Sequence, residues 1–365
     1  MKLDKFHKDF QLNGISFSSV DELLLYAHDF SDEVYRFLET WFSTDFFIYV
    51  KTSGSTGNPK EIKLQKEQMI HSAFATGNYF NLKESTTALL CLHVDFVAGK
   101  MMLVRALSLG WHLDVVKPNS SPLKGLKKKY DFSAMVPLQL ENSIDSLHLI
   151  KKIIIGGGEV SMQLQNKLQD ISTNVFATYG MTETITHIAV KKLNNLLFFQ
   201  EGMTKQVLHQ EYYQTLPNVE IYKDARNCLV IVAPKISKNV IFTNDIVQLI
   251  SDTQFQWLGR FDTVINSGGV KLYPERIEEK LAKIMTTRFF VAGITDQKLG
   301  KKLILLVELK TNNVLEDKQF INAEIKKMAS LSKYEIPKEI YFIAAFIETP
   351  TKKIQRKKTL NLIDF

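Results

Sequence analysis

The most informative motif in the sequence is Thr52-Ser53-Gly54-Ser55-Thr56-Gly57-Asn58-Pro59-Lys60, which follows the apolar segment Phe46–Val50. Its glycines allow a tight turn that aims backbone N–H groups at an anion, and its hydroxyl side chains and closing lysine add further donors. It is not a Walker A loop, in which Gly-Lys is followed by Ser or Thr. The stretch therefore predicts a different phosphate-binding loop, placed directly after a strand.

Strands and helices are expected to alternate on both sides of this loop. Gly110 is expected to end a helix in left-handed conformation, and Ser161 to cap another helix. The expected helices are Asp21–Trp41, Gln68–Tyr79 and Ala98–Leu109, and the expected strands are Phe46–Lys51, Glu61–Leu64, Thr86–Leu92, Trp111–Val116, Phe132–Val136, Lys152–Ile155 and Asn174–Ala177. Such alternation indicates an α/β fold with a mostly parallel sheet.

The pattern changes to hairpins after about Val219, with strands expected at Val219–Tyr222 and Cys228–Val232. From Pro274 onward we expect a compact α+β unit. Its expected elements are the helices Glu275–Met285 and Ile321–Met328 and the strands Phe289–Ile294, Leu303–Leu309 and Ile340–Ile347. We therefore predict a large domain, residues 1–261, and a small mobile domain, residues 262–365.

Two further motifs lie at the ends of expected strands, where ligands bind in open α/β sheets. Thr178-Tyr179-Gly180-Met181-Thr182-Glu183-Thr184 follows one strand, and Gly156-Gly157-Gly158-Glu159 follows its neighbour. Gly180 permits close approach to a ligand, and a carboxylate such as Glu183 suits a hard cation bound to phosphate. A strand-ending turn would explain Gly180 but not Thr182-Glu183.

The remaining motifs span the predicted domain boundary and reach the C-terminus. They are Thr243-Asn244-Asp245, Gly259-Arg260-Phe261-Asp262, Gly268-Gly269 and Thr349-Pro350-Thr351-Lys352-Lys353-Ile354-Gln355-Arg356. Lys353 carries a compact charge on a flexible stem, which suits pairing with carboxylate and phosphate oxygens.

Taken in order, these motifs resemble those of the adenylate-forming superfamily, which includes acyl- and aryl-CoA ligases, peptide-synthetase adenylation domains and luciferases. The resemblance implies that ATP, Mg²⁺ and coenzyme A are used, with the β- and γ-phosphates on Thr52–Lys60. It implies that Tyr179 stacks near adenine, Thr182 contacts the α-phosphate, Glu183 holds Mg²⁺, and Asp245 and Arg260 bind the ribose. Asn244 stands where the family has glycine, and asparagine tolerates left-handed backbone.

The same resemblance assigns Lys353 as the catalytic lysine, although Lys352 stands where glycine is usual and could assist it. It also makes Asp262 the hinge and lets Gly268 and Gly269 line the coenzyme A tunnel. Phe96, Gly99, Lys100 and Gly156–Gly158 are expected to line the acyl pocket. Carboxylate activation as an acyl-AMP, followed by thioester formation, is the implied reaction.

The chain differs from the usual pattern in length, since only the segment 1–51 precedes the first loop. An N-terminal subdomain is therefore expected to be mostly missing. That shortness resembles the compact o-succinylbenzoate–CoA ligases of menaquinone biosynthesis. An acid of this kind carries a second carboxylate, for which Lys100 or Arg105 is a candidate partner, unless both are surface residues of their helix.

Composition leaves several alternatives open. Forty-six basic and 39 acidic residues give a net charge of +7, which fits polyanionic ligands but does not choose among them. A ligase that loads a carrier protein, a non-catalytic nucleotide sensor and a nucleic-acid binder are the rival interpretations. Cys91 and Cys228 lie in apolar runs without metal-ligand spacing, so reduced core thiols and a cytoplasmic location without a membrane span are expected. The oligomeric state stays open, a homo-oligomer included.

Overall fold

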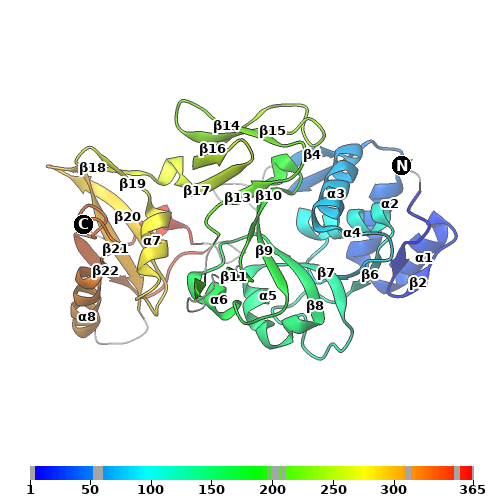
Figure 1. Ribbon diagram of the computed structural model, residues 1–365, viewed down its shortest axis with the longest axis horizontal. Helices are drawn as coiled ribbons and strands as arrows, with labels where there is room; N and C mark the ends of the chain where they lie inside the picture. The colour runs from blue at the N-terminus through cyan, green and yellow to red at the C-terminus, as the bar shows by residue number, and fades with distance from the viewer. Residues whose placement is uncertain are drawn as a thin grey trace.

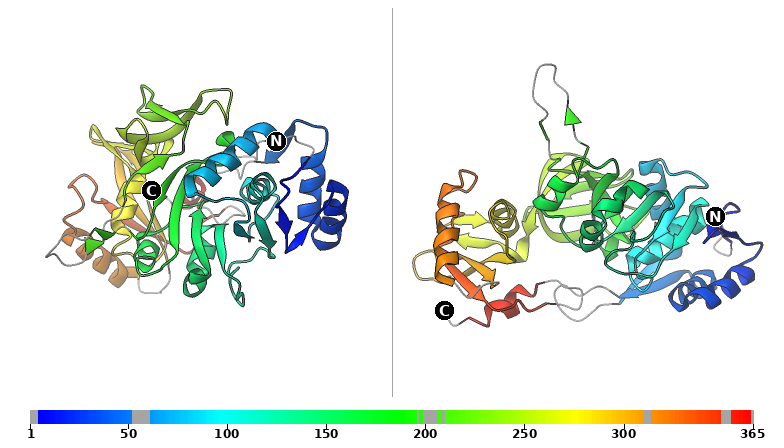
Figure 2. Two further views of the ribbon diagram at one scale, coloured as in Figure 1. Left: turned by 45° about the vertical axis from the view of Figure 1, so that its right-hand side comes forward. Right: turned by 90° about the horizontal axis from the view of Figure 1, so that it is seen from below.

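A computed structural model describes residues 5–51, 61–195, 197–198, 206–207, 210–309, 314–348 and 354–363. A large sheet and a small sheet lie at opposite ends of the molecule, with the N-terminus at one end and the C-terminus at the other (Figure 1). The views in Figure 2 show the small sheet and its helices remote from the first helices of the chain.

The large sheet has 13 strands. Their order across the sheet is β14 (Glu220–Lys223), β15 (Cys228–Val232), β16 (Ile241–Ser251), β17 (Gln254–Arg260), β13 (Tyr213–Thr215), β10 (His187–Lys192), β9 (Asn174–Gly180), β8 (Ile150–Ile155), β7 (Tyr130–Met135), β5 (Thr87–Leu90), β6 (His112–Val115), β1 (Gln11–Leu12) and β2 (Ile15–Ser16).

The prediction of a mostly parallel sheet is correct for only one part of it. The pairs from β9 through β8, β7, β5 and β6 to β1 are parallel. The pairs from β14 to β9, and β1 with β2, are antiparallel. The expected hairpins thus extend the α/β sheet through β10 and β13, so the sheet as a whole is mixed.

Helices cover both faces of the parallel strands. In β5, Ala88 and Leu90 face one hydrophobic core, while Leu89 and the following Cys91 face the other. Burial on both faces explains why this segment is a continuous apolar run instead of an alternating one. One core includes α3 (Lys66–Phe80) and α4 (Val97–Leu109); the other includes α5 (Pro137–Asn142), the 3₁₀ helix η1 (Ile144–Leu149) and α6 (Met162–Lys167).

The expected single helix over Asp21–Trp41 is two helices, α1 (Val20–Phe30) and α2 (Asp32–Phe42). Ser31 lies between them with an extended backbone, φ −162°, and its hydroxyl accepts a hydrogen bond from the N–H of Val34. The serine therefore caps the second helix at the cost of continuing the first.

Two predicted helix ends are confirmed. Gly110 ends α4 with φ +70°, in the left-handed region. Ser161 begins α6 by accepting a hydrogen bond from the N–H of Leu164. Both helix ends could be predicted from the sequence, because glycine adopts the left-handed conformation without a Cβ clash and serine accepts a hydrogen bond from a free N–H of the first turn.

The segments flanking the expected phosphate loop form a hairpin of their own. Strand β3 (Phe47–Lys51) pairs antiparallel with β4 (Glu61–Gln65), in a two-stranded sheet separate from the large one. The loop itself, 52–60, lies outside the described residues. A second small pair, β11 (Leu197–Phe198) with β12 (Gln206–Val207), also stands apart.

The small sheet follows β17, after the 3₁₀ helix η3 (Phe261–Thr263). Its strand order is β19 (Val270–Leu272), β18 (Ile265–Ser267), β21 (Gly300–Glu308) and β20 (Phe289–Asp296), and β22 (Glu339–Ile343) also pairs with β21. Its helices are α7 (Pro274–Leu281), α8 (Val314–Lys327) and α9 (Arg356–Leu360). Helix α7 ends four residues before the predicted Met285.

Within the described parts of the chain, every helix is too short or too polar to cross a membrane.

Candidate active site

The motif Thr178–Thr184 occupies the end of β9 and the turn that follows. The Thr178 hydroxyl donates a 2.8 Å hydrogen bond to the carbonyl of Ile155 at the end of β8. Gly180 lies so close to the returning chain that a Cβ there would sit 2.2 Å from the carbonyl oxygen of Thr186. Only glycine fits this position, so the turn brings Thr182 and Glu183 to the strand ends.

Glu183 is exposed at the 3₁₀ helix η2 (Thr182–Thr184), next to partly buried Met181 and Thr182. No group of three or more metal-binding side chains occurs among the residues that the structure describes. A single carboxylate still suits Mg²⁺, because this ion keeps most of its ligands as water and substrate phosphate. Glu183 is therefore the described residue that would hold such an ion together with a nucleotide.

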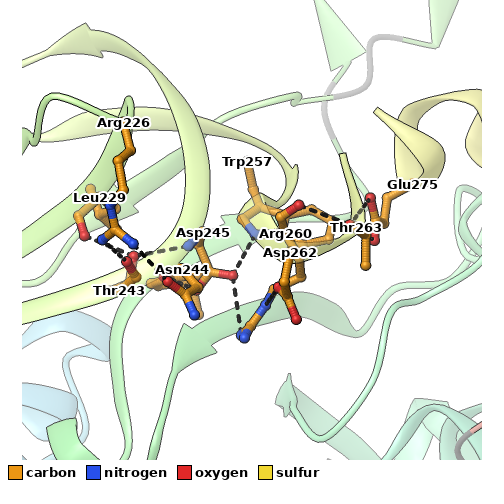
Figure 3. A network of polar contacts seen from close by, with 11 residues as sticks. Arg226, Leu229, Thr243, Asn244, Asp245, Trp257, Arg260, Asp262, Thr263 and Glu275 are labelled. Carbon is orange, nitrogen blue, oxygen red and sulfur yellow. Dashed lines mark hydrogen bonds and ion pairs between the residues drawn. The ribbon is translucent and has the colours of Figure 1, made fainter. Parts of the chain in front are cut away.

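A second feature, which we call the ribose network, consists of Tyr179, Asp245, Trp257 and Arg260. Figure 3 shows Asp245, Trp257 and Arg260. The Asp245 carboxylate accepts hydrogen bonds from the Tyr179 hydroxyl at 2.6 Å and the Trp257 indole N–H at 3.2 Å. The Arg260 guanidinium lies 3.6 Å from the same carboxylate. Burial and the nearby Asp245 charge raise the pKa of Tyr179 well above its ordinary value, so its phenol stays a donor.

The ribose network is built by the pairing of two long strands. Asp245 on β16 lies opposite Arg260 on β17, and Tyr179 comes from β9. The Tyr179 ring packs edge-on against Phe255, with 5.1 Å between ring centroids. Two consecutive strands, β16 and β17, and the distant strand β9 thus fix the carboxylate of Asp245, a residue that is 6% exposed.

Asn244, which stands where the family has glycine, does not use a left-handed backbone. Asn244 lies within β16, and the residues with positive φ are found elsewhere in the described chain. Its side-chain carbonyl accepts a 3.0 Å hydrogen bond from Arg226, which also donates to the backbone carbonyl of Thr243. The asparagine is therefore held as an ordinary strand residue by the β14–β15 turn.

The predicted hinge residue, Asp262, lies in η3 between the large and small sheets. Its carboxylate is 3.3 Å from the Arg260 guanidinium. One residue on, the Thr263 hydroxyl donates to the Arg260 carbonyl at 2.8 Å and contacts both carboxylate oxygens of Glu275, at 3.0 and 3.3 Å. Glu275 thus ties the start of α7 to the segment where the two sheets meet (Figure 3).

The expected acyl-pocket residues begin at the N-terminus of α4. Phe96 is about half exposed, and Gly99 lies against the His93 carbonyl, 2.2 Å from where a Cβ would be. Lys100 points back to its own loop, where its ammonium donates to the carbonyls of Val94 at 2.6 Å and Asp95 at 3.0 Å. Lys100 therefore closes the loop before α4.

The glycines 156–158 follow β8, as predicted, and Gly156 lies beside the Thr178 hydroxyl. Gly157 adopts φ +79°. This places the run next to the end of β9, so Gly156–Gly158 and Thr178–Glu183 meet at one edge of the sheet.

A second polar group, the acyl-side cluster, consists of Thr76, Arg105, Thr186 and His187. Arg105 is 1% exposed and contacts the hydroxyls of Thr76 at 3.3 Å and Thr186 at 3.4 Å. Its remaining contact is the Met102 sulfur at 3.7 Å. Burial lowers the pKa of Arg105 to about 9, which leaves the guanidinium charged at neutral pH.

The remaining predicted residues separate into two sets. Gly268 and Gly269 form the turn of the β18–β19 hairpin, both with positive φ. The second set lies outside the described residues and consists of Thr52, Ser53, Gly54, Ser55, Thr56, Gly57, Lys60, Lys352 and Lys353. Arg356, just beyond Lys353, forms a two-pronged ion pair with Glu278 on α7 at 2.8 and 2.7 Å.

Sequence reasoning missed Trp257, Arg226 and His187. Trp257 lies three residues before Arg260 and is buried in part by the sheet. Strict alternation along β17 would place Trp257 and Arg260 on opposite faces, and the register shift between Ile246 and Val247 in the β16–β17 pair has no local sequence signal. His187 follows Glu183 by four residues, but its burial depends on the turn at Gly180, which no local pattern reveals.

Comparisons with known proteins identify the family of this chain. The family model described as "AMP-binding enzyme" matches residues 21–223. A 2-succinylbenzoate–CoA ligase of Bacillus cereus (strain ZK / E33L) is 24% identical, over 86% of this chain and 70% of that protein. An acyl-CoA synthetase (AMP-forming)/AMP-acid ligase II-like protein of Dyadobacter fermentans is 37% identical, with 91% and 95% of the two chains covered and a TM-score of 0.58.

An o-succinylbenzoate–coenzyme A synthetase from Bacillus subtilis, solved with ATP and magnesium ion, has the same fold. Its TM-score is 0.69 at 18% identity, with 94% of this chain and 82% of that one covered. These findings confirm the predicted α/β fold and the predicted class, an AMP-forming ligase. The ordered motifs and the family match, which spans more than half of the chain, lead to one conclusion: the protein belongs to the AMP-binding enzyme family.

Proposed function

We propose that the protein activates 2-succinylbenzoate with ATP and Mg²⁺ as the acyl-AMP and then transfers the acyl group to coenzyme A. The ribose network carries the nucleotide half of this proposal, because a fixed carboxylate beside a phenol and a guanidinium suits the two hydroxyls of a ribose. The names of the Bacillus relatives support the acid and the thiol.

Arg105 carries the choice of acid. A buried guanidinium without a carboxylate partner among the described residues is costly, so its retention needs a compensating anion. The ring carboxylate of 2-succinylbenzoate provides one, while the succinyl carboxylate is the group to be activated. Lys100 is the weaker candidate, because two backbone carbonyls of its own loop already receive its ammonium.

The proposed reaction divides between the two parts of the chain. Thr182 and Glu183, with the loop 52–60, position the phosphates and Mg²⁺. Lys353 stabilises the charge that develops as the carboxylate attacks the α-phosphorus. A rotation about Asp262 then withdraws Lys353 and presents Gly268–Gly269 to coenzyme A, a gating step of a kind that often limits turnover. The change from one sheet to the other between Arg260 and Ile265 supports the proposed division at residues 261 and 262.

A screen of acids by pyrophosphate release tests the acid. It should compare 2-succinylbenzoate with benzoate, 4-phenylbutyrate and medium-chain fatty acids, in the wild type and in Lys100→Ala. We expect 2-succinylbenzoate to be turned over fastest and the selectivity of Lys100→Ala to match the wild type. Faster turnover of a monocarboxylate by the wild type would rule out this acid but leave the ligase class intact.

Separate assays of the two half-reactions test the catalytic lysine and the acceptor. Lys353→Ala should slow adenylation by about 10²–10³-fold, as for loss of a preorganised donor, and spare thioester formation from a supplied acyl-AMP. Equal loss in both halves would contradict the assigned role. Coenzyme A should be acylated in preference to a carrier-protein thiol; the reverse preference would identify a carrier-protein ligase.

A further inference from the structure

His187 stands next to Arg105 with one ring nitrogen unused. The residue is 3% exposed, and its Nε2 is buried without a hydrogen-bond partner in the described part of the chain. Its other nitrogen, Nδ1, lies 3.4 Å from the Thr186 hydroxyl. An unpaired buried polar atom destabilises a protein, so such an atom calls for an explanation.

The neighbours of His187 decide which nitrogen carries the proton. An Arg105 N–H points to the Thr186 hydroxyl oxygen, 3.4 Å away, and guanidinium groups only donate. That oxygen therefore acts as acceptor toward Arg105, which leaves its own hydrogen free to be donated to Nδ1 of His187. With Nδ1 accepting, the neutral ring carries its hydrogen on Nε2.

The protonation state agrees with this arrangement. Burial, together with the Arg105 charge, holds the pKa of His187 well below its ordinary value. The ring is therefore neutral at physiological pH, with one N–H to donate. Arg105 donates to hydroxyls and a sulfur but to no carboxylate among the described residues, and His187 has an unused N–H. Such a pair suits an anionic acceptor and disfavours a cation.

The backbone fixes His187 at this place. Ile185, the residue two before it, has φ +67° and ψ −61°, and the N–H of Thr186 donates to the Thr184 carbonyl at 2.7 Å across it. This γ-turn is strained for a β-branched residue. The Thr184 hydroxyl stabilises the turn, since it accepts a hydrogen bond from the N–H of Met181 and donates one to the carbonyl of Thr186. The turn follows the motif Thr178–Thr184 directly and leads to His187.

From this geometry we propose that His187 determines acid specificity: its Nε2–H and the Arg105 guanidinium together bind the second carboxylate of the acid. The inference rests on the proposed function and adds to it a neutral donor beside the cation. Two donor groups match the two oxygens of a carboxylate, so a dicarboxylic acid gains a hydrogen bond that a monocarboxylic acid of the same shape cannot make.

The test uses two acids that differ only in that carboxylate, 2-succinylbenzoate and 4-oxo-4-phenylbutanoate. In His187→Leu the ratio of their kcat/KM values should fall by about 10- to 100-fold, the loss expected of one hydrogen bond to a charged group. The change should lie in the KM for 2-succinylbenzoate, with kcat and the monocarboxylate nearly unaffected. His187→Gln keeps an N–H donor and should retain most of the preference.

The exposed His148 provides the matched control, since His148→Leu should behave as the wild type. Equal losses for both acids in His187→Leu, or an unchanged ratio in a folded variant, would overturn the role of His187 while the wild-type preference for 2-succinylbenzoate stands. A wild type that prefers the monocarboxylate would instead refute the proposed acid, and the inference with it. Unfolding temperatures of all variants show whether each is folded.

Discussion

The ribose network and the acyl-side cluster differ in how their buried charges are paired. In the ribose network, three donors surround the Asp245 carboxylate. In the acyl-side cluster, the Arg105 charge contacts hydroxyls and a sulfur but no carboxylate among the described residues, and His187 keeps an unused nitrogen. The buried charge is therefore paired within the protein in the first region, and it lacks an opposite charge among the described residues in the second.

This difference implies different costs of substitution. Removing the charge from a satisfied network leaves buried partners unpaired, so stability and ligand binding fall together. Removing an unpaired buried charge relieves a desolvation cost, so stability rises while binding is lost. The comparison is therefore testable by measuring stability and activity in the same variants.

The largest effect is expected at Asp245. Asp245→Ala removes the acceptor of Tyr179 and Trp257, and with it the proposed ribose contacts. We expect kcat/KM for ATP to fall by about 10²–10⁴-fold, the range for two hydrogen bonds to a charged group, and the protein to lose about 2–5 kcal/mol of stability. Steady-state kinetics and urea unfolding measure both. A stable Asp245→Ala protein with normal ATP kinetics would remove the ribose network from the site.

Arg105→Met should separate function from stability. Methionine has a similar length without the charge, so we expect the free energy of unfolding to rise by about 1–2 kcal/mol. The kcat/KM for 2-succinylbenzoate should fall by about 10²–10³-fold, with the KM for ATP unchanged. If Arg105→Met instead destabilises the protein and leaves acid kinetics intact, Arg105 is a structural residue and the contrast between the two regions disappears.

A smaller effect is expected in the pH dependence of stability. Since the pKa of His187 is lowered in the folded protein, the unfolded chain takes up a proton first as pH falls through about 6.5, and stability is lost below that value. Between pH 7.5 and 5.5 the wild type should therefore lose about 1 kcal/mol more than His187→Leu. Urea unfolding at both pH values measures this, and equal losses would mean that His187 is not held neutral.

The smallest effect is expected between the two sheets. The Gln163 side chain on α6 donates to the carbonyls of Ala282 at 3.1 Å and Met285 at 3.3 Å, just beyond the end of α7. Gln163 is exposed, so Gln163→Ala should cost no more than about 1 kcal/mol. We expect unchanged adenylation and an altered rate of thioester formation; identical rates for both half-reactions would show that this contact does not influence the proposed rotation.

Much of the molecule follows from local sequence. Gly110 and Ser161 marked helix ends, and the motifs at Gly156–Gly158 and Thr178–Thr184 marked the ends of β8 and β9. These structural predictions are confirmed because each depends on the chemistry of one residue type in one backbone state.

Other features depended on contacts between distant segments. The mixed sheet arises because β13 joins β10 to β17, a pairing that no local pattern specifies. The proposed preference for Arg105 over Lys100 depends on Lys100 folding back onto the Val94 carbonyl. The proposed role of His187 depends on the turn at Gly180, where chain segments approach too closely for any side chain.

The exchange of labelled pyrophosphate into ATP, measured with and without 2-succinylbenzoate, is the direct test of the proposed adenylation reaction. This reaction requires the nucleotide site, Mg²⁺ and the acid at once, but neither coenzyme A nor the second half-reaction. We predict exchange that depends on the acid and is at least about tenfold faster with 2-succinylbenzoate than with 4-oxo-4-phenylbutanoate, because the monocarboxylate lacks the group that Arg105 and His187 are proposed to bind. Exchange that is absent with every acid, or faster with the monocarboxylate, would contradict the proposed function.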